Sequence, residues 1–129
     1  MNERETIDAA IAAWNERGVD AFLEFMAPDV EWHAPPGFLE GEVFQGRAAL
    51  APQMREQFGS VFTNSRTELL DAVEGPNGWL VAAHQTAEHG ATTVEWQGWY
   101  VVHIENGLLK RMWVFMDREP ALQQAGLHG

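Results

Sequence analysis

Apolar residues recur at helical spacing near the N-terminus and then give way to strict alternation. A helix is predicted over residues 3–17, because apolar side chains return at i, i+3, i+4 and i+7 and Gly18 follows as a stop. The residues on this apolar face are Ile7, Ala10, Ile11 and Trp14. A short second helix is predicted over residues 20–26. Apolar and polar residues alternate over residues 29–34, which predicts a strand with Trp32 on its apolar face.

Proline and glycine punctuate residues 35–46, which predicts a loop. Its apolar side chains must cover something, so the loop is either a lid over a pocket or a segment packed against the edge of the core. These side chains are Phe38, Leu39, Val43 and Phe44. A third helix is predicted over residues 47–58. Because Pro52 fits only a first turn, we expect its regular part to begin at Leu50 or Ala51, after an irregular start.

Alternating segments separated by turn signals predict strands in the second half of the chain. Their ranges are 66–74, 79–89, 93–105 and 108–117. The dipeptide Asn106-Gly107 is typical of a tight hairpin. A last helix is predicted over residues 119–125, with Asp117 accepting hydrogen bonds from its first amides. The pattern as a whole predicts a single α+β domain over residues 1–129, with an antiparallel meander and the helices on one side of the sheet.

Side chains alternate between the two faces of a strand, so each face can be assigned from the sequence. One face of the predicted meander combines aromatic with titratable residues, which is typical of a small-molecule pocket beneath the helices. This face is expected to hold His84, Thr86, Glu88, Trp96, Tyr100, Met112 and Val114. The other face is apolar and has too few helices to cover it, so we expect a homodimer that packs sheet against sheet. Its expected residues are Val81, Trp99, Val101, Trp113 and Phe115.

Composition narrows the class of partner. The chain is 46% hydrophobic, and its 19 acidic and 8 basic residues give a formal net charge of -11. Such a charge repels phosphate backbones and anionic lipids, so we expect neither nucleic acid nor a membrane as partner. Cysteine is absent and no histidine or carboxylate cluster has ligand spacing, so we expect no metal and no cofactor. The polar N-terminus and the lack of a long apolar run predict a cytoplasmic protein.

Three segments together resemble a known family. They are Asp29–Pro36, the helix start Gly46-Arg47-Ala48-Ala49, and the run from Asn106-Gly107-Leu108-Leu109-Lys110-Arg111 through Phe115-Met116-Asp117-Arg118-Glu119-Pro120-Ala121-Leu122. Over nearly its whole length the chain resembles a SnoaL-like member of the nuclear transport factor 2-like superfamily. The resemblance implies a cone-shaped, curved antiparallel sheet closed by three helices, with a short C-terminal helix and a deep apolar pocket. Members include ketosteroid isomerases, polyketide cyclases, limonene epoxide hydrolases, scytalone dehydratases and non-catalytic binding modules.

Within this superfamily the motifs look most like limonene epoxide hydrolase. That enzyme uses an Asp-Arg-Asp triad together with a tyrosine and an asparagine that position water. The resemblance places the tyrosine at Trp32 and the asparagine at Ala34. It places the arginine at His84, the neighbouring aspartate at Thr86 and the second aspartate at Val114. The triad is therefore not retained, and the resemblance does not imply epoxide hydrolysis by that mechanism.

His84 is the leading candidate for chemistry. A histidine at mid-strand on an apolar face can act as a general acid or base, or bind a ligand; the alternative is a core histidine satisfied by its neighbours. Tyr100 is the second catalytic candidate, as a hydrogen-bond donor. The expected substrate-binding residues are Trp32, Thr86, Glu88, Trp96, Met112 and Val114. His33 is held in reserve, because with Glu31 it forms a possible acid/base pair at i, i+2.

Two functional hypotheses remain open from the sequence. In the first, the chain binds a small, mostly apolar molecule and performs cofactor-free acid/base chemistry on it, of the isomerase, cyclase, dehydratase or hydrolase type. In the second, the same pocket belongs to a non-catalytic small-molecule-binding module. A titratable group in an apolar cavity favours the first, and the missing triad favours the second.

Overall fold

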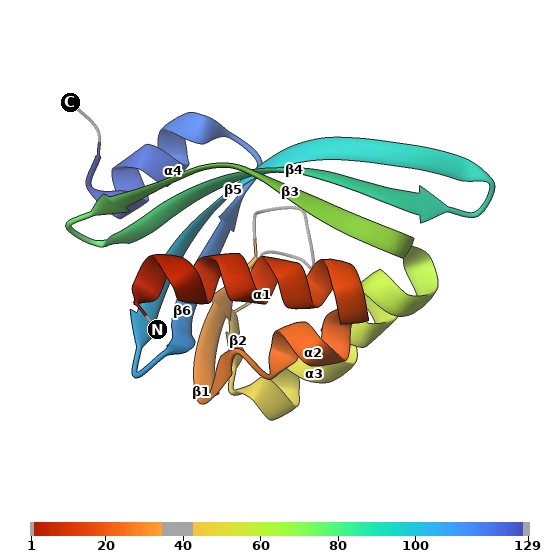
Figure 1. Ribbon diagram of the computed structural model, residues 1–129, viewed down its shortest axis with the longest axis horizontal. Coiled ribbons are helices and arrows are strands. Elements are labelled where there is room, and N and C mark those ends of the chain that lie inside the picture. The colour runs from red at the N-terminus through yellow and green to blue at the C-terminus, as the bar shows by residue number, and fades with distance from the viewer. Residues whose placement is uncertain (1, 35–42, 128–129) are drawn as a thin grey trace.

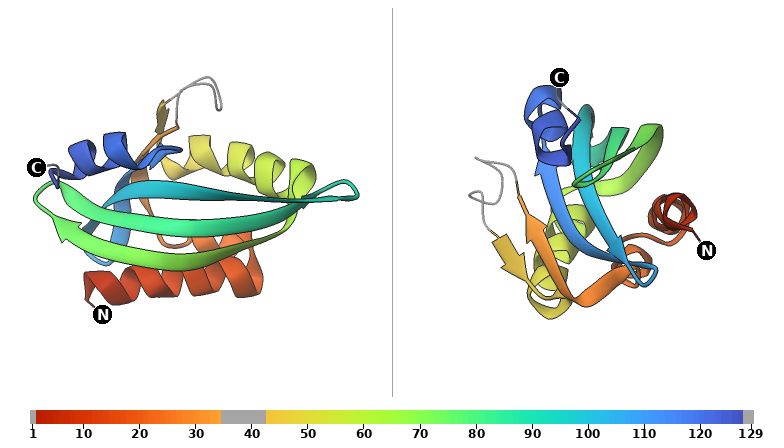
Figure 2. Two further views of the ribbon diagram at one scale, coloured as in Figure 1. Left: turned by 90° about the horizontal axis from the view of Figure 1, so that it is seen from above. Right: turned by 90° about the vertical axis from the view of Figure 1, so that its left-hand side faces the viewer.

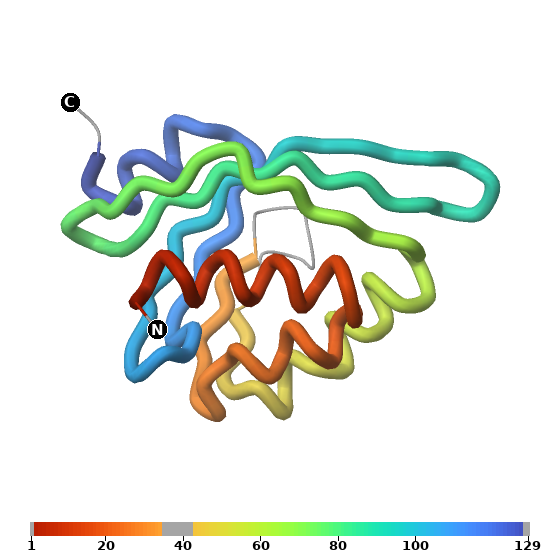
Figure 3. Tube along the Cα trace, viewed as in Figure 1, coloured from red at the N-terminus to blue at the C-terminus, as the bar shows by residue number. Residues whose placement is uncertain are grey.

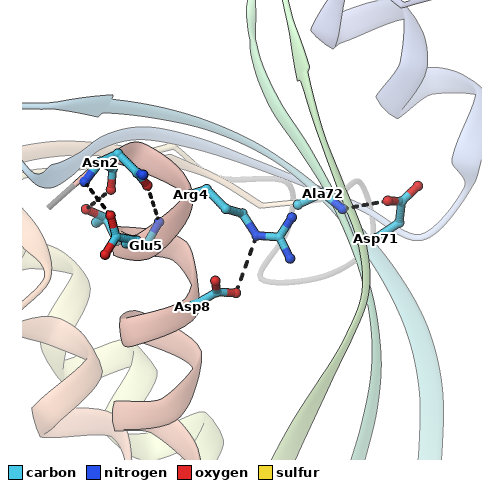
Figure 4. A network of polar contacts seen from close by, with 7 residues as sticks. Asn2, Arg4, Glu5, Asp8, Asp71 and Ala72 are labelled. Carbon is cyan, nitrogen blue, oxygen red and sulfur yellow. Dashed lines mark hydrogen bonds and ion pairs between the residues drawn. The ribbon is translucent and has the colours of Figure 1, made fainter.

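The computed structural model describes residues 2–34 and 43–127 of the chain. Its first helix, α1 (Glu3–Arg17), has the predicted bounds and begins with a capping box (Figure 4). The Asn2 side chain accepts from the Glu5 amide at 2.8 Å, and the Glu5 carboxylate accepts from the Asn2 amide at 3.2 Å. One turn further, the Arg4 guanidinium donates to Asp8 at 3.4 Å. The capping box satisfies the Glu5 amide, which has no partner within the helix, and the Asn2 amide before it.

The remaining helices are α2 (Val19–Leu23), α3 (Arg47–Glu56) and α4 (Arg118–Ala125), and a π-helical segment, η2 (Gln57–Val61), continues α3. The expected irregular start of α3 is wrong, because the helix is regular from Arg47 and runs through Pro52. The expected cap of α4 is also wrong. Asp117 occupies the N-cap position, but its side chain makes no capping hydrogen bond.

One mixed sheet forms the body of the molecule. Its strands are β1 (Met26–His33), β2 (Val43–Gln45), β3 (Thr63–Gly75), β4 (Gly78–His89), β5 (Thr92–Glu105) and β6 (Leu108–Phe115). Their order across the sheet is β2-β1-β6-β5-β4-β3. Neighbouring strands are antiparallel except β1 and β6, which are parallel. The sheet is therefore mixed, where the sequence predicted only antiparallel pairs.

The sheet is strongly curved, with three helices packed against one of its faces (Figures 1 and 2). Helices α1, α2 and α3 lie on its inner, concave side, while α4 packs against β4, β5 and β6 on its outer, convex side. The paired strands β4 and β5 extend well past the end of α1, as the tube in Figure 3 shows. The predicted α+β cone is confirmed, but the expectation that every helix lies on one side is wrong because α4 covers part of the outer face.

A short strand was missed in the segment expected to be a loop. Val43 and Phe44 belong to β2, where Phe44 pairs with Trp32 and is buried in the core. Val43, on the opposite face, is 45% exposed. Phe38 and Leu39 lie outside the described residues.

The face assignment of β4 is wrong. The turn between β4 and β5 is two residues long and pairs His89 with Thr92, so even-numbered residues of β4 stand opposite odd-numbered residues of β5. Gln85 is therefore the residue opposite Trp96 on the concave face. The residues that move to the convex face are His84, Thr86 and Glu88, and Val81 moves from the predicted outer face to the concave one.

The main core lies between the concave face and α1, α2 and α3. Met26, Val30 and Leu50 are each 0% exposed there, and burial of such side chains stabilises the fold by about 1.5–3 kcal/mol each. A second, smaller cluster lies beneath α4, where Ala121 and Ala125 meet the outer face of the sheet. None of the helices in residues 2–34 and 43–127 has the length and apolar character needed to cross a bilayer.

Candidate functional site

A cavity of about 200 Å³ opens between the concave face of the sheet and helices α1 and α3. Strands β4, β5 and β6 supply its floor, and α1, α3 and η2 supply its walls. The described residues that line it are Ile7, Ala10, Ile11, Trp14, Phe22, Trp32, Leu50, Gln53, Met54, Gln57, Phe58, Phe62, Thr67, Val81, Ala83, Gln85, Trp96, Tyr100, Val102, Leu109, Met112, Val114 and Met116. Most are apolar, as expected for a site that takes a small organic molecule.

Polar groups form one connected chain across the cavity floor. The Tyr100 hydroxyl donates to the side-chain oxygen Oε1 of Gln85, and the side-chain nitrogen Nε2 of Gln85 donates to the Thr67 hydroxyl at 3.2 Å. Asn15 of α1 anchors this chain from the side. Its amide donates to the Thr67 carbonyl at 2.8 Å and accepts from the Thr67 amide at 2.7 Å. The cavity therefore holds a fixed row of hydrogen-bonding groups on an otherwise apolar floor.

Tyr100 is the only ionisable side chain among the described residues that line the cavity. Burial raises the pKa of the Tyr100 hydroxyl well above its usual range. The hydroxyl therefore stays protonated at neutral pH and acts as a hydrogen-bond donor. No imidazole or carboxylate of the described lining can serve as a general base.

The structure brings together part of the predicted site and disperses the rest. Trp32, Trp96, Tyr100, Met112 and Val114 line the cavity as expected. The remaining members, which are His84, Thr86 and Glu88, lie on the convex face instead. His84 is partly exposed there with its Nε2 3.6 Å from a Glu95 carboxylate oxygen, and Glu88 accepts from the Asn64 amide at 2.7 Å. The structure thus places the leading catalytic candidate outside the cavity.

The most important residue that sequence reasoning missed is Gln85. It is 7% exposed, and it links Tyr100 to Thr67. Its signal was the short turn at Gly90-Ala91, because a two-residue turn sets which residues of β4 and β5 share a face. Gln53 and Gln57 were also missed. They line the cavity from α3 and η2, four residues apart.

The reserve candidate His33 lies on the convex face. Its Nε2 atom is 2.5 Å from Glu31 Oε1, and its ring stacks on Trp113 with 4.9 Å between ring centroids. The hydrogen bond with His33 is the main cause that lowers the pKa of Glu31, and Arg111 adds a smaller attraction. This pair exists as the sequence suggested, but it does not face the cavity. Across the described part of the chain, no three histidine, aspartate or glutamate side chains gather as metal ligands.

Comparison of sequences assigns the chain to a protein family. Residues 7–112 match the model of the SnoaL-like domain family. The chain is a member of the SnoaL-like domain family. No curated protein matches this SnoaL-like chain in sequence.

Solved structures share the cone fold of this SnoaL-like chain at low sequence identity. A nuclear transport factor 2-like protein of unknown function from Burkholderia pseudomallei has a TM-score of 0.78 at 18% identity, over 97% of this chain and 98% of that one. TerC, co-crystallised with polyporic acid, has a TM-score of 0.73 at 22% identity, over 95% of each chain. A putative SnoaL-like polyketide cyclase from Jannaschia sp. CCS1 has a TM-score of 0.71 at 14% identity, over 98% of this chain and 92% of that one. The family resemblance seen in the sequence is confirmed.

Proposed function

We propose that this chain binds a small, uncharged and mostly apolar molecule in the cavity of the cone. The observation that carries the proposal is the lining, which is apolar apart from a few amide and hydroxyl groups and holds no charged side chain among the described residues. A charged ligand would be buried there without a counter-charge, which costs several kcal/mol or more. An uncharged ligand gains about 25 cal/mol for each Å² of apolar surface that it removes from water.

The relatives support a small organic molecule as the ligand class. TerC shares the cone fold and was co-crystallised with polyporic acid, and another chain of this fold is described as a putative polyketide cyclase. The cavity of about 200 Å³ is larger than an engineered cavity of about 150 Å³ that holds benzene, so it accommodates a small molecule with more than one ring.

In this proposal the described lining residues bind the ligand but do not catalyse a reaction on it. Acid/base chemistry needs a group that changes its protonation near neutral pH. His84 is on the wrong face for this, and the raised pKa of Tyr100 keeps its proton in place. The described lining therefore favours the non-catalytic module among the two hypotheses.

The experiment that tests the proposal titrates the protein with the neutral dye N-phenyl-1-naphthylamine and follows dye fluorescence. We expect saturable binding with one site per chain. Ala83→Leu fills the cavity from its floor, because Ala83 lines it and is 1% exposed, and should weaken binding by about tenfold, or 1.4 kcal/mol. Ala82→Leu is the matched control, because this neighbour faces the convex side.

A lack of saturable binding by the wild type would overturn the proposal. So would equal weakening by Ala83→Leu and Ala82→Leu, since the dye would then not sit in the cavity. Far-UV circular dichroism and thermal unfolding check that the variants fold. Val114→Phe fills the cavity from β6 and gives a second filling variant should Ala83→Leu fail to fold.

A further inference from the structure

On the cavity floor, Tyr100, Gln85 and Thr67 carry more donor hydrogens than their hydrogen bonds to one another use. Tyr100 and Thr67 each carry one hydroxyl hydrogen, and the Gln85 amide carries two. The contacts of Gln85 with Tyr100 and Thr67 use two of these four hydrogens. Flipping the Gln85 amide exchanges the donor and acceptor in each contact but leaves the same number unused. Two donors therefore remain, and neither makes a further hydrogen bond to a described residue.

Unused donors in an apolar cavity are a recognition element. A buried N–H or O–H without an acceptor costs about 1–3 kcal/mol, so a ligand that supplies an acceptor is favoured over one that does not. A carbonyl oxygen has two lone pairs and can accept from both donors. Because no charged side chain is found in the described lining, the acceptor of a neutral ketone, ester or amide suits these donors better than a carboxylate, which would be buried without a counter-charge.

Gly98 makes this arrangement possible. A Cβ atom built on Gly98 would lie 2.8 Å from the Tyr100 hydroxyl oxygen and 3.1 Å from Cζ of its ring. The Tyr100 side chain thus folds back along β5 and lies directly over Gly98, which lets its hydroxyl reach Gln85. Ala83 stands opposite Gly98 on β4, so the floor beneath the ring is made of the smallest residues.

We propose that Gln85, held by Tyr100 over the gap at Gly98, selects a carbonyl-bearing ligand in the cavity. This inference rests on the proposed function, because it assigns chemistry to the ligand of the same cavity. Gln85 would contact the ligand directly, whereas Gly98 is a positioning residue that acts through Tyr100.

The test compares two probes of nearly equal shape, 1-indanone and indane, by their displacement of N-phenyl-1-naphthylamine from the full chain. The ratio of the two dissociation constants is the readout. For the wild type we expect 1-indanone to bind about tenfold more tightly, a ratio that corresponds to 1.4 kcal/mol. The reason is that each ligand displaces water from the donors, but only the ketone replaces the hydrogen bonds.

Variants assign this ratio to residues. Gln85→Leu should bring the ratio close to one, while His84→Leu, at the next position and on the convex face, should leave it unchanged. Gly98→Ala should lower the ratio because the new Cβ pushes the flexible Tyr100 side chain away. Gly59→Ala is its matched control, since a Cβ there meets no heavy atom within 4 Å.

A double-variant cycle separates positioning from a general structural effect. If Gly98 acts only through Tyr100, then Gly98→Ala lowers the ratio in the wild type and has no further effect in the Tyr100→Phe background. An equal further loss in that background would overturn the positioning role. Equal binding of both probes by the wild type, or an unchanged ratio in Gln85→Leu, would overturn the inference and leave the proposed function intact. Failure of both probes and of the dye to bind would instead refute the proposed function, and the inference with it.

Discussion

On the outer face of β1, a hydrogen bond between two side chains lowers the pKa of one of them. Glu31 and His33 share the convex face of β1, and their side chains are in contact at 2.5 Å. Both side chains are partly shielded from solvent, with 29% and 27% exposed. The pKa of Glu31 is lowered chiefly by the hydrogen bond with His33. A lowered pKa means that the folded chain holds the proton of Glu31 less tightly than the unfolded chain does.

This difference predicts a pH dependence of stability that Glu31→Gln reduces. The stabilisation is fully present above the unfolded pKa of Glu31, near 4.5, and is lost as the pH falls through its lower folded value. Between pH 6 and pH 3.5 the wild type should lose up to about 1 kcal/mol more unfolding free energy than Glu31→Gln, as measured by urea denaturation. Glu105→Gln, at the exposed end of β5, is the control and should follow the wild type. Identical losses in the wild type and Glu31→Gln would contradict the prediction.

At the scale of elements, one side chain ties helix α1 to an edge of the sheet. Strand β3 is the last strand on its side, so its outer amides and carbonyls have no strand partner. Asn15 supplies the hydrogen bonds that a neighbouring strand would make at this edge, because its side-chain amide both donates to and accepts from the backbone of Thr67. Thr67 in turn receives a hydrogen bond from Gln85 at 3.2 Å. The wall of the cavity and its polar floor are therefore linked through two residues.

Replacing Asn15 should weaken the fold. We expect Asn15→Ala to lower the unfolding free energy by about 1–3 kcal/mol, since two half-buried backbone groups of Thr67 lose their partners. Thermal unfolding measures this loss. Glu16→Ala, the exposed neighbour on α1, is the control and should change stability by less than about 0.5 kcal/mol. Loss of stability in both variants alike would mean that Asn15 contributes only as a helical residue.

The sequence predicts the faces of some strands correctly and those of others wrongly. The inner faces of β5 and β6 were predicted correctly, because each strand alternates over many residues and its apolar set is large. The face of β4 was not, because both of its faces carry apolar residues and only the length of the turn at Gly90 decides between them. The strand β2 was missed because three residues are too short for a period of two to emerge. The alternation of apolar and polar residues therefore could not predict that Gln85 and its hydrogen bonds lie on the cavity floor.

At the scale of the whole molecule, α4 covers only part of the outer face. Leu80 and Val101 are buried beneath it, and Val101 is 0% exposed. Trp99, Trp113 and Phe115 on β5 and β6 remain half-buried, and Trp99 pairs directly with Phe115. The patch is thus continuous with the cluster beneath α4, yet α4 does not enclose it. Val81, which the sequence placed in this patch, lies in the cavity instead.

We propose that a second copy of the chain covers this patch about a two-fold axis, with sheet packed against sheet. An isologous contact brings Trp99, Trp113 and Phe115 of one copy against the same residues of the other, and aromatic side chains of this kind dominate interface energies. Each chain carries a formal charge of -11, so repulsion opposes association and salt should favour the dimer.

Sedimentation velocity at tens of micromolar should therefore show a dimer at 0.5 M sodium chloride and a larger monomer fraction at 0.02 M. Phe115→Glu should shift the population to monomer at both salt concentrations, because it buries a further charge in each half of the interface. Leu70→Glu is the matched control. Leu70 is 47% exposed on the edge strand β3, away from the patch, and its replacement should leave the dimer in place. A wild-type chain that stays monomeric at high salt, or a dimer that survives Phe115→Glu in a folded variant, would show that the aromatic patch is not the interface.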